Sequence, residues 1–115
     1  MLKNLFSSMH IGKMDVNNRL VVPAMVMNFC NSDGTATEKY IAYHETKAKG
    51  GWGLIITEDY AVDPRGKGFT GIPGLWNDAQ IESHSKLPER IHRYGSKIVA
   101  QIYHAGRQTN HFVIG

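Results

Sequence analysis

The segment Lys97–Arg107, KIVAQIYHAGR, decides the fold when it is set beside an earlier segment, Asn18–Met25, NRLVVPAM. Both contain a short run rich in β-branched residues, which favours a β-strand. Gln101 and His104 come at the end of the later run, and Pro23 closes the earlier one. Two short strands that end in polar or turn-forming residues predict an α/β protein whose chemistry lies at the C-terminal ends of its strands.

The composition is that of an ordinary globular domain. Of the 115 residues, 42% are hydrophobic and 20% are charged, which argues against a disordered chain. The net charge is only +3, and acidic residues are interleaved with the basic ones. Nucleic-acid binders usually concentrate basic residues in a stripe, so we expect no nucleic-acid partner.

Patterns for export or membrane insertion are not found. Residues 1–14 lack the apolar core of a signal peptide, and no run approaches the ~20 apolar residues of a membrane span. The single cysteine, Cys30, excludes an internal disulfide and fits a reducing compartment. We therefore expect a cytoplasmic protein without a membrane contact.

The chain alternates between strand-like and helix-like patterns. Apolar runs bounded by glycine or proline indicate the strands, and continuous runs are typical of strands covered on both faces. The predicted strands are a hairpin over residues 9–17 that turns at Gly12-Lys13, a short strand over 19–22, and two buried strands over 53–57 and 97–102.

Two helices are predicted between these strands. The first begins at Thr35, with Glu38 completing a capping box, and Gly50-Gly51 ends it. The second takes Asp78 as its N-cap, and Pro88 should kink or split it. Residues spaced for inward faces are Tyr40, Ile41, Tyr43, His44 and Ala48 in the first helix, and Ile81, Leu87, Ile91 and Tyr94 in the second.

The order hairpin, β, α, β, α, β predicts a parallel sheet with right-handed crossovers. A sheet of only three strands keeps two open edges and needs helical cover on both faces. Residues 1–115 therefore read as the beginning of a larger α/β domain.

Three motifs are given plain structural interpretations. Residues 66–71, GKGFTG, fit the letters of a dinucleotide-binding loop, but they neither follow a strand directly nor open a helix, so we interpret them as a flexible loop. The six histidines lack the spacing and cysteine partners of a structural zinc site, and no metal is predicted. Cys30 is interpreted as an unreactive loop thiol.

Two features leave alternatives open. Glu58 and Asp59 directly follow a predicted strand, where they could bind a metal or act as acid and base, or could form a solvated turn. Gln101 lies within an apolar strand, so its amide, if buried, needs partners. Those partners could be neighbouring backbone groups or the edge of a bound ring.

Three longer segments together resemble the N-terminal portion of the Old Yellow Enzyme family, the FMN-dependent NAD(P)H:flavin oxidoreductases and ene-reductases. They are IGKMDVNNRLVVPAM (Ile11–Met25), YHETKAKGGWGLIITE (Tyr43–Glu58) and QIYHAGR (Gln101–Arg107). The pattern is most similar to enoate and 2,4-dienoyl-CoA reductases. The resemblance implies an FMN-binding (β/α)8 TIM barrel, preceded by a β-hairpin, of which residues 1–115 form roughly the first three β/α units, an incomplete domain.

The resemblance also implies a cofactor site at the C-terminal mouth of the barrel. The residues that would contact the flavin after the first barrel strand are Pro23, Ala24, Met25 and Val26. Asp59 matches a position near the flavin where many relatives have a small residue, and Gln101 matches a glutamine that hydrogen-bonds the flavin pyrimidine. Asn28 and His104 are predicted to contact substrate, and His104 also shapes the loop beneath the flavin.

The implied reaction transfers hydride from NADH or NADPH to FMN, and from reduced FMN to the β-carbon of an activated alkene such as an enoate or enone. The substrate would be a small unsaturated carbonyl compound. No residue of the chain is assigned a catalytic role, because the family's proton donor and substrate-anchoring pair lie beyond the third strand. The alternative is a non-catalytic truncated barrel that needs further chain or a partner, such as another copy in a homo-oligomer, to fold and bind FMN.

Overall fold

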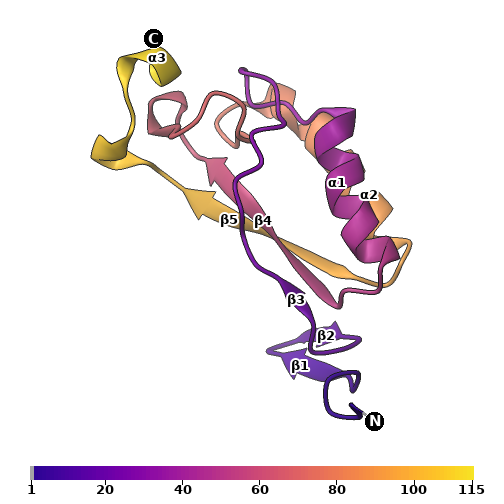
Figure 1. Ribbon diagram of the computed structural model, residues 1–115. Helices are drawn as coiled ribbons and strands as arrows, with labels where there is room; N and C mark the ends of the chain where they lie inside the picture. The colour runs from indigo at the N-terminus through magenta and orange to yellow at the C-terminus, as the bar shows by residue number, and fades with distance from the viewer. Residues whose placement is uncertain (1) are drawn as a thin grey trace.

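A three-stranded parallel sheet with two helices on one side forms the body of the computed structural model, which describes residues 2–115 (Figure 1). The sheet has the order β3 (Val21–Val22), β4 (Leu54–Ala61) and β5 (Lys97–Tyr103). Both pairings are parallel, which confirms the predicted α/β arrangement. The N-terminus and the C-terminus lie at opposite ends of the molecule (Figure 1).

The predicted hairpin is present as β1 (Met9–Ile11) and β2 (Met14–Val16), which pair antiparallel around Gly12. Gly12 has φ +60°, a conformation that glycine adopts without steric cost. The hairpin is tied to the start of β4 by Asn18, whose Nδ2 donates to the Gly51 carbonyl at 2.8 Å and whose Oδ1 accepts the Gly53 N–H at 3.0 Å. The hairpin therefore covers the N-terminal ends of the parallel strands.

The first helix, α1 (Glu38–Lys49), begins later than predicted. Thr37 is its N-cap, and the Thr37 hydroxyl accepts the N–H of Tyr40 at 3.1 Å. The predicted capping box at Thr35 is wrong because Asp33 accepts the Thr35 N–H at 2.9 Å and so holds Thr35 in a turn. The inward face is as predicted, with Tyr40, Ile41, His44 and Ala48 buried and Tyr43 half-buried.

The second helix, α2 (Ile81–His92), also differs from the prediction at its start. A 3₁₀ turn, η2 (Asp78–Gln80), precedes it, and Asn77 caps that turn by accepting the Ala79 N–H at 2.9 Å. Asp78 is therefore not the N-cap. The helix continues across Pro88 without being split.

The inward face of α2 was predicted correctly only in part. Leu87 and Ile91 are buried, but Ile81 is 63% exposed and Tyr94 is 43% exposed. His84 takes the inward position instead, because its ring finds two hydrogen-bond partners in the interior.

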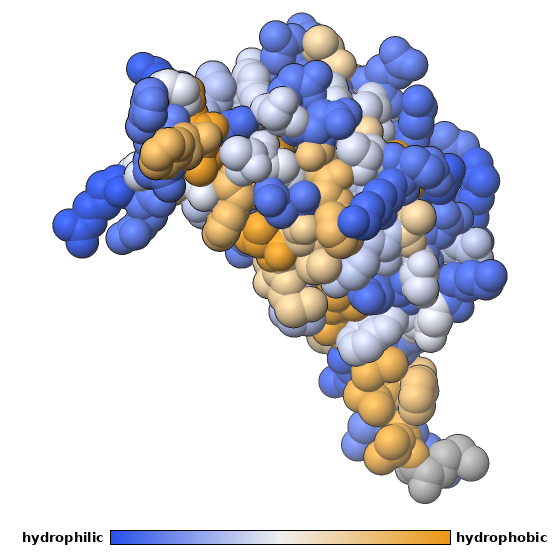
Figure 2. All heavy atoms as spheres, turned by 45° about the horizontal axis from the view of Figure 1, so that its top comes forward, coloured by the Kyte–Doolittle hydropathy of each residue, from blue (hydrophilic) through white to orange (hydrophobic). Residues whose placement is uncertain are grey.

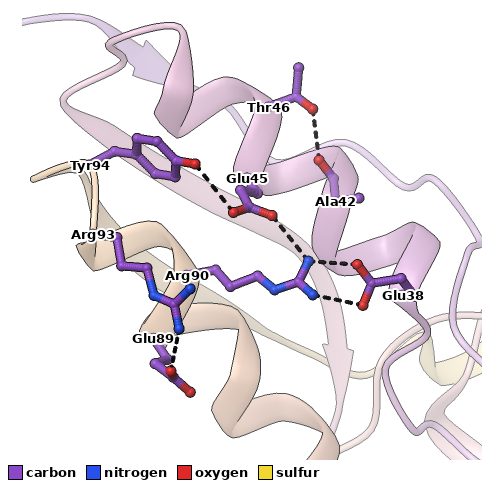
Figure 3. A network of polar contacts seen from close by, with 8 residues as sticks. All are labelled: Glu38, Ala42, Glu45, Thr46, Glu89, Arg90, Arg93 and Tyr94. Atoms are coloured by element: carbon purple, nitrogen blue, oxygen red, sulfur yellow. Dashed lines mark hydrogen bonds and ion pairs between the residues drawn. The ribbon is translucent and has the colours of Figure 1, made fainter.

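Polar side chains join the two helices across their outer surface (Figure 3). Arg90 of α2 donates to both carboxylate oxygens of Glu38, at 2.6 and 3.0 Å, and to Glu45 at 3.0 Å. The Tyr94 hydroxyl donates to the other oxygen of Glu45 at 3.4 Å. One guanidinium that bridges two carboxylates fixes the relative position of the helices more specifically than an isolated surface pair would.

The strands differ from the prediction at their ends and in their burial. β3 is shorter than predicted, and β4 continues through Glu58 and Asp59 to Ala61, so these acidic residues lie within a strand rather than in a loop. β5 was predicted to be buried, yet Ile102 is 65% exposed. No described element pairs with the free edge of β5, and hydrophobic side chains remain uncovered on the molecular surface (Figure 2).

The segment between β4 and α2 is mostly irregular, with one 3₁₀ turn, η1 (Pro64–Gly66). Residues 66–71 do not open a helix, which confirms their interpretation as a loop. After β5 come η3 (Gly106–Gln108) and the short helix α3 (His111–Ile114). Within residues 2–115, no helix combines the length and the apolar character that crossing a membrane requires.

The close packing of the hairpin against Gly53 gives a stability prediction. A Cβ at residue 53 would lie 2.6 Å from the Asn18 carbonyl oxygen and 2.9 Å from Val16 Cγ1. We expect Gly53→Ala to lower the free energy of unfolding by about 1–3 kcal/mol through overpacking, measured by urea denaturation. Gly50→Ala is the control, because its nearest neighbour would be 3.3 Å away at an ordinary φ of −74°. An equal loss in both variants would contradict this explanation.

His44 gives a second prediction, for the dependence of stability on pH. Its ring is buried, neither nitrogen has a hydrogen-bond partner among the described residues, and burial lowers its pKa from 6.5 to about 4. The folded state resists protonation of His44, whereas the unfolded chain does not. The contribution of neutral His44 to the free energy of unfolding is therefore complete above pH 6.5 and is lost as the pH falls toward 4. One pKa unit corresponds to about 1.4 kcal/mol, so the loss is about 3 kcal/mol.

Urea denaturation at several pH values measures this loss. We expect His44→Phe, which keeps a ring at 4.8 Å from that of Tyr40, to be less sensitive to acid by that amount. His92→Gln, an exposed change on α2, is the control. A His44→Phe variant as sensitive to acid as the unsubstituted protein would refute the assignment.

Candidate functional site at the C-terminal edge of the sheet

The C-terminal ends of the three parallel strands bring most of the predicted site residues to one edge. Residues 23–29 leave β3 in an irregular segment, while Asp59 of β4 pairs directly with Gln101 of β5. Residues paired across parallel strands point to the same face. The structure therefore brings Asp59 and Gln101 together, beside the segment that contains Pro23, Ala24, Met25 and Val26.

A β-bulge in β4 creates this pairing. Ile56 is opposite Val99, but the next pair is Asp59 with Gln101, so β4 contains one extra residue. Within the bulge, the Thr57 hydroxyl accepts the Gln101 N–H at 3.4 Å and donates to the Glu58 carbonyl at 3.1 Å. The hydroxyl thus replaces the strand pairing that the bulge interrupts.

Glu58 and Asp59 have different surroundings. Glu58 is 0% exposed, and its Oε2 accepts the backbone N–H groups of Met27 and Asn28 at 3.1 and 3.2 Å. Burial is the main cause that raises the pKa of Glu58, the Asp59 charge adds to it, and the two N–H donors oppose it. Oε1 has no partner within residues 2–115. The prediction of a solvated turn at this dipeptide is therefore wrong, because the Glu58 carboxylate is buried and hydrogen-bonded to backbone N–H groups.

Asp59 and Gln101 have more open surroundings. Asp59 is half-buried, and partial burial raises the pKa of its carboxyl group. The Gln101 side chain is exposed, and its amide makes no hydrogen bond within the described part of the chain. An ionisable carboxyl next to an unoccupied amide offers both acceptors and donors to a ligand at this edge.

Asn28 has a structural role that the sequence did not reveal. Its φ is +58°, the only positive φ among the described residues other than glycine. Its side-chain oxygen accepts the Gly71 N–H at 2.6 Å, and the Gly71 carbonyl accepts the Cys30 N–H at 2.8 Å. The segment after β3 is thus connected to the long loop after β4, while the Asn28 side-chain nitrogen makes no hydrogen bond within residues 2–115.

His104 is positioned against the η1 turn. Its Nδ1 accepts the Gly106 N–H at 2.9 Å, and a Cβ at Gly66 would come within 2.6 Å of its ring. The neighbouring Ala105 N–H donates to the Gly66 carbonyl at 2.8 Å. His104 is therefore placed by the loop after β4, and no hydrogen bond joins it to Gln101 or Asp59 within the described residues.

A buried chain of polar side chains supports β4 from the helix side. His84 Nε2 donates to the Gly34 carbonyl at 2.7 Å, so the neutral ring must accept at Nδ1, where the Tyr60 hydroxyl lies at 3.0 Å. The Tyr40 hydroxyl donates to that of Tyr60 at 3.3 Å. The sequence did not predict this connection between α1, α2 and β4, because Tyr40, Tyr60 and His84 lie in three different elements.

Cys30 is buried, and burial together with the Glu58 charge raises the pKa of its thiol. A thiol of raised pKa is a poor nucleophile. Within residues 2–115, no three His, Cys, Asp or Glu side chains are grouped in a way that could hold a metal ion.

The fold places the chain in the class of parallel α/β proteins, with the candidate site at the C-terminal ends of the strands. Residues 4–112 match the model of the NADH:flavin oxidoreductase / NADH oxidase family. The chain belongs to this family, and the resemblance to Old Yellow Enzymes found in the sequence is confirmed.

Relatives of known name agree with this assignment. The chain is 44% identical over 107 residues to an NADH oxidase of Thermoanaerobacter brockii, covering 92% of this chain and 16% of the relative. It is 38% identical over 109 residues to an NADPH dehydrogenase of Bacillus subtilis (strain 168), covering 94% and 32%. The chain thus spans a third or less of the length of these relatives.

Solved structures confirm the fold over this part of the barrel. A 2-naphthoyl-CoA reductase in complex with 2-naphthoyl-CoA superposes with a TM-score of 0.92 at 32% identity, covering 96% of this chain and 17% of that one. The Old Yellow Enzyme from Pichia sp. AKU4542 superposes with a TM-score of 0.86 at 33% identity, covering 92% and 28%.

Asn28 gives a prediction that separates its side chain from its backbone. Asn28→Gly keeps the positive φ but loses the bond to Gly71, while Asn28→Ala loses both. We expect the free energy of unfolding to fall by about 1 kcal/mol in the glycine variant and by about 1–2 kcal/mol more in the alanine variant. Urea denaturation measures both, and equal values for the two variants would contradict the role of the backbone conformation.

Proposed function

We propose that the chain supplies part of the FMN site of an NAD(P)H-dependent oxidoreductase whose substrates are small molecules with an activated alkene. The observation that carries the proposal is the pairing of Asp59 with Gln101 at the C-terminal edge of the sheet, next to the exposed segment after β3. Membership of the NADH:flavin oxidoreductase family supports the cofactor and the hydride donor. The whole domain for which we propose this activity is longer than the 115 residues of the chain.

The residues at this edge fit a flavin ring. The Gln101 amide is exposed and free to bond the ring's polar edge, and a fixed amide donor favours negative charge there without adding a charge of its own. Pro23, Ala24, Met25 and Val26 would contact the ring system, with Asp59 close by as an acceptor for a ring N–H. When bound, FMN supplies an acceptor for hydride from NADH or NADPH and a hydride donor to the alkene.

The substrate assignment extends the same proposal. Asn28 and His104 would face the substrate, Asn28 through its free side-chain nitrogen and His104 through the exposed part of its ring. A 2-naphthoyl-CoA reductase is among the solved relatives, which supports a small-molecule carbonyl substrate for this chain, and we propose one of the enoate or enone type.

Titration with FMN tests the cofactor site directly. We expect the protein to quench flavin fluorescence saturably, and Gln101→Ala to raise the dissociation constant by about tenfold, the effect of losing one hydrogen bond. Gln108→Ala, which removes an exposed amide of the same kind from η3, is the control. Equal affinities of the two variants would refute the role of Gln101.

Anaerobic mixing of the FMN-loaded protein with NADH or NADPH tests the reaction. The flavin absorbance should bleach with at least one nicotinamide and return when an enone such as 2-cyclohexenone is added. The measurement uses the whole domain that contains this chain, and absence of bleaching with both donors would refute the proposed hydride transfer, whatever the affinity for FMN.

Exposed apolar residues and the free edge of β5 favour a second candidate. Val99 and Ile102, which lie on opposite faces of β5, are 37% and 65% exposed, and the strand has a free edge. Such surface is normally covered in parallel sheets, so the chain would be a non-catalytic part that binds FMN only with further chain or a partner. Oligomers in light scattering, together with no FMN binding by the monomer, would select this candidate over the first.

A further inference from the structure

Among residues 2–115, Glu58 is the one fully buried carboxylate, and the proposed function does not use it. It lies in the β-bulge of β4, next to Asp59. Its Oε2 accepts two consecutive backbone N–H groups, those of Met27 and Asn28, from a segment about thirty residues earlier in the chain. Burying a carboxylate is costly unless its hydrogen bonds are needed, and here they hold a segment without regular secondary structure.

The segment that Glu58 holds is one that the backbone alone does not stabilise. Residues 23–29 belong to no helix or strand, and Asn28 has φ +58°. A non-glycine residue keeps such a conformation only when its surroundings enforce it. Glu58 enforces it through the backbone N–H, and Gly71 enforces it through the side chain. Hydrogen bonds to a charged acceptor are stronger than neutral ones.

Glu58 also connects the two halves of the candidate site. On one side its carboxylate holds Met27 and Asn28, which continue the Pro23–Val26 segment. On the other side its own backbone precedes Asp59, the partner of Gln101. A change in the Glu58 side chain would therefore move the segment after β3 relative to the Asp59–Gln101 pair.

We propose that Glu58 is a positioning residue: its buried carboxylate holds the backbone of Met27 and Asn28, and with it the Pro23–Val26 segment, in the conformation that binds FMN. This inference rests on the proposed function. It assigns Glu58 no contact with cofactor or substrate. The effect reaches the cofactor only through the segment that Glu58 holds.

Two variants separate this role from a general contribution to the core. Glu58→Gln keeps an oxygen that can accept both N–H groups, and Glu58→Leu fills a similar volume without an acceptor. Glu82→Gln, an exposed change on α2, is the control. For each protein we would measure the FMN dissociation constant by fluorescence quenching and the hydrogen exchange of the Met27 and Asn28 amides by NMR.

We expect Glu58→Leu to lose exchange protection at both amides and to bind FMN at least about tenfold more weakly, because two hydrogen bonds are lost. Glu58→Gln should keep both protection and affinity, within about threefold. Its two amide proton resonances should move upfield, because a neutral acceptor replaces a charged one. If Glu58→Leu does not fold, the Met27 and Asn28 amide resonances of Glu58→Gln test the inference. Unchanged chemical shifts of these amides would overturn it.

The outcomes also separate this inference from the proposed function. Loss of amide protection in Glu58→Leu with unaltered FMN affinity would overturn the positioning role and leave the FMN site standing. Failure of the unsubstituted protein to bind FMN would overturn the proposed function, and the positioning role with it. Rescue of both readouts by Glu58→Gln, with Glu82→Gln unchanged throughout, would support the inference.

Discussion

The β-bulge in β4 is the constraint on which the arrangement of the candidate site depends. In a regular strand, successive residues point to opposite faces, so residues five apart should not share a face, yet Ile55 and Tyr60 both belong to the core beneath the helices. The extra residue between Ile56 and Asp59 makes this compatible. It directs Tyr60 toward His84 and leaves Asp59 on the opposite face, paired with Gln101. Without the bulge, the residues of β4 after Ile56 would point to the opposite faces, with Asp59 toward the helices and Tyr60 away from them.

The sequence predicted the order of elements better than their limits. The hairpin, the strands and the inward residues of α1 follow from periodicity and glycine positions, which are local signals. The predicted helix starts were wrong because Asp33 holds Thr35 in a turn, so that Thr37 caps α1 instead, and because Asn77 rather than Asp78 caps the turn before α2. β4 was predicted too short because Glu58 reads as polar, and only the tertiary contact with Met27 and Asn28 shows why a carboxylate is tolerated inside a strand.

The candidate site likewise contains residues that the sequence predicted and residues that only the structure shows. Gln101 was found from the sequence because a polar residue within an apolar strand is conspicuous, and its pairing with Asp59 follows from the parallel topology once the bulge is known. The contacts of Glu58, the bond between Asn28 and Gly71, and the chain from Tyr40 to Gly34 join residues 20 to 50 positions apart. No local pattern predicts such pairs, because each residue type is compatible with a solvent-exposed loop.

Polar groups are buried in this chain where the backbone has no regular partner. The carboxylate of Glu58 accepts backbone N–H groups of the segment after β3, and the ring of His84 donates to the Gly34 carbonyl. The ammonium group of Lys67, a residue only 6% exposed, donates to the Ser32 carbonyl at 2.8 Å. Each replaces a hydrogen bond that secondary structure would otherwise supply. The loops at the C-terminal edge are therefore held by hydrogen bonds from buried side chains. Their outward surface remains free for a ligand.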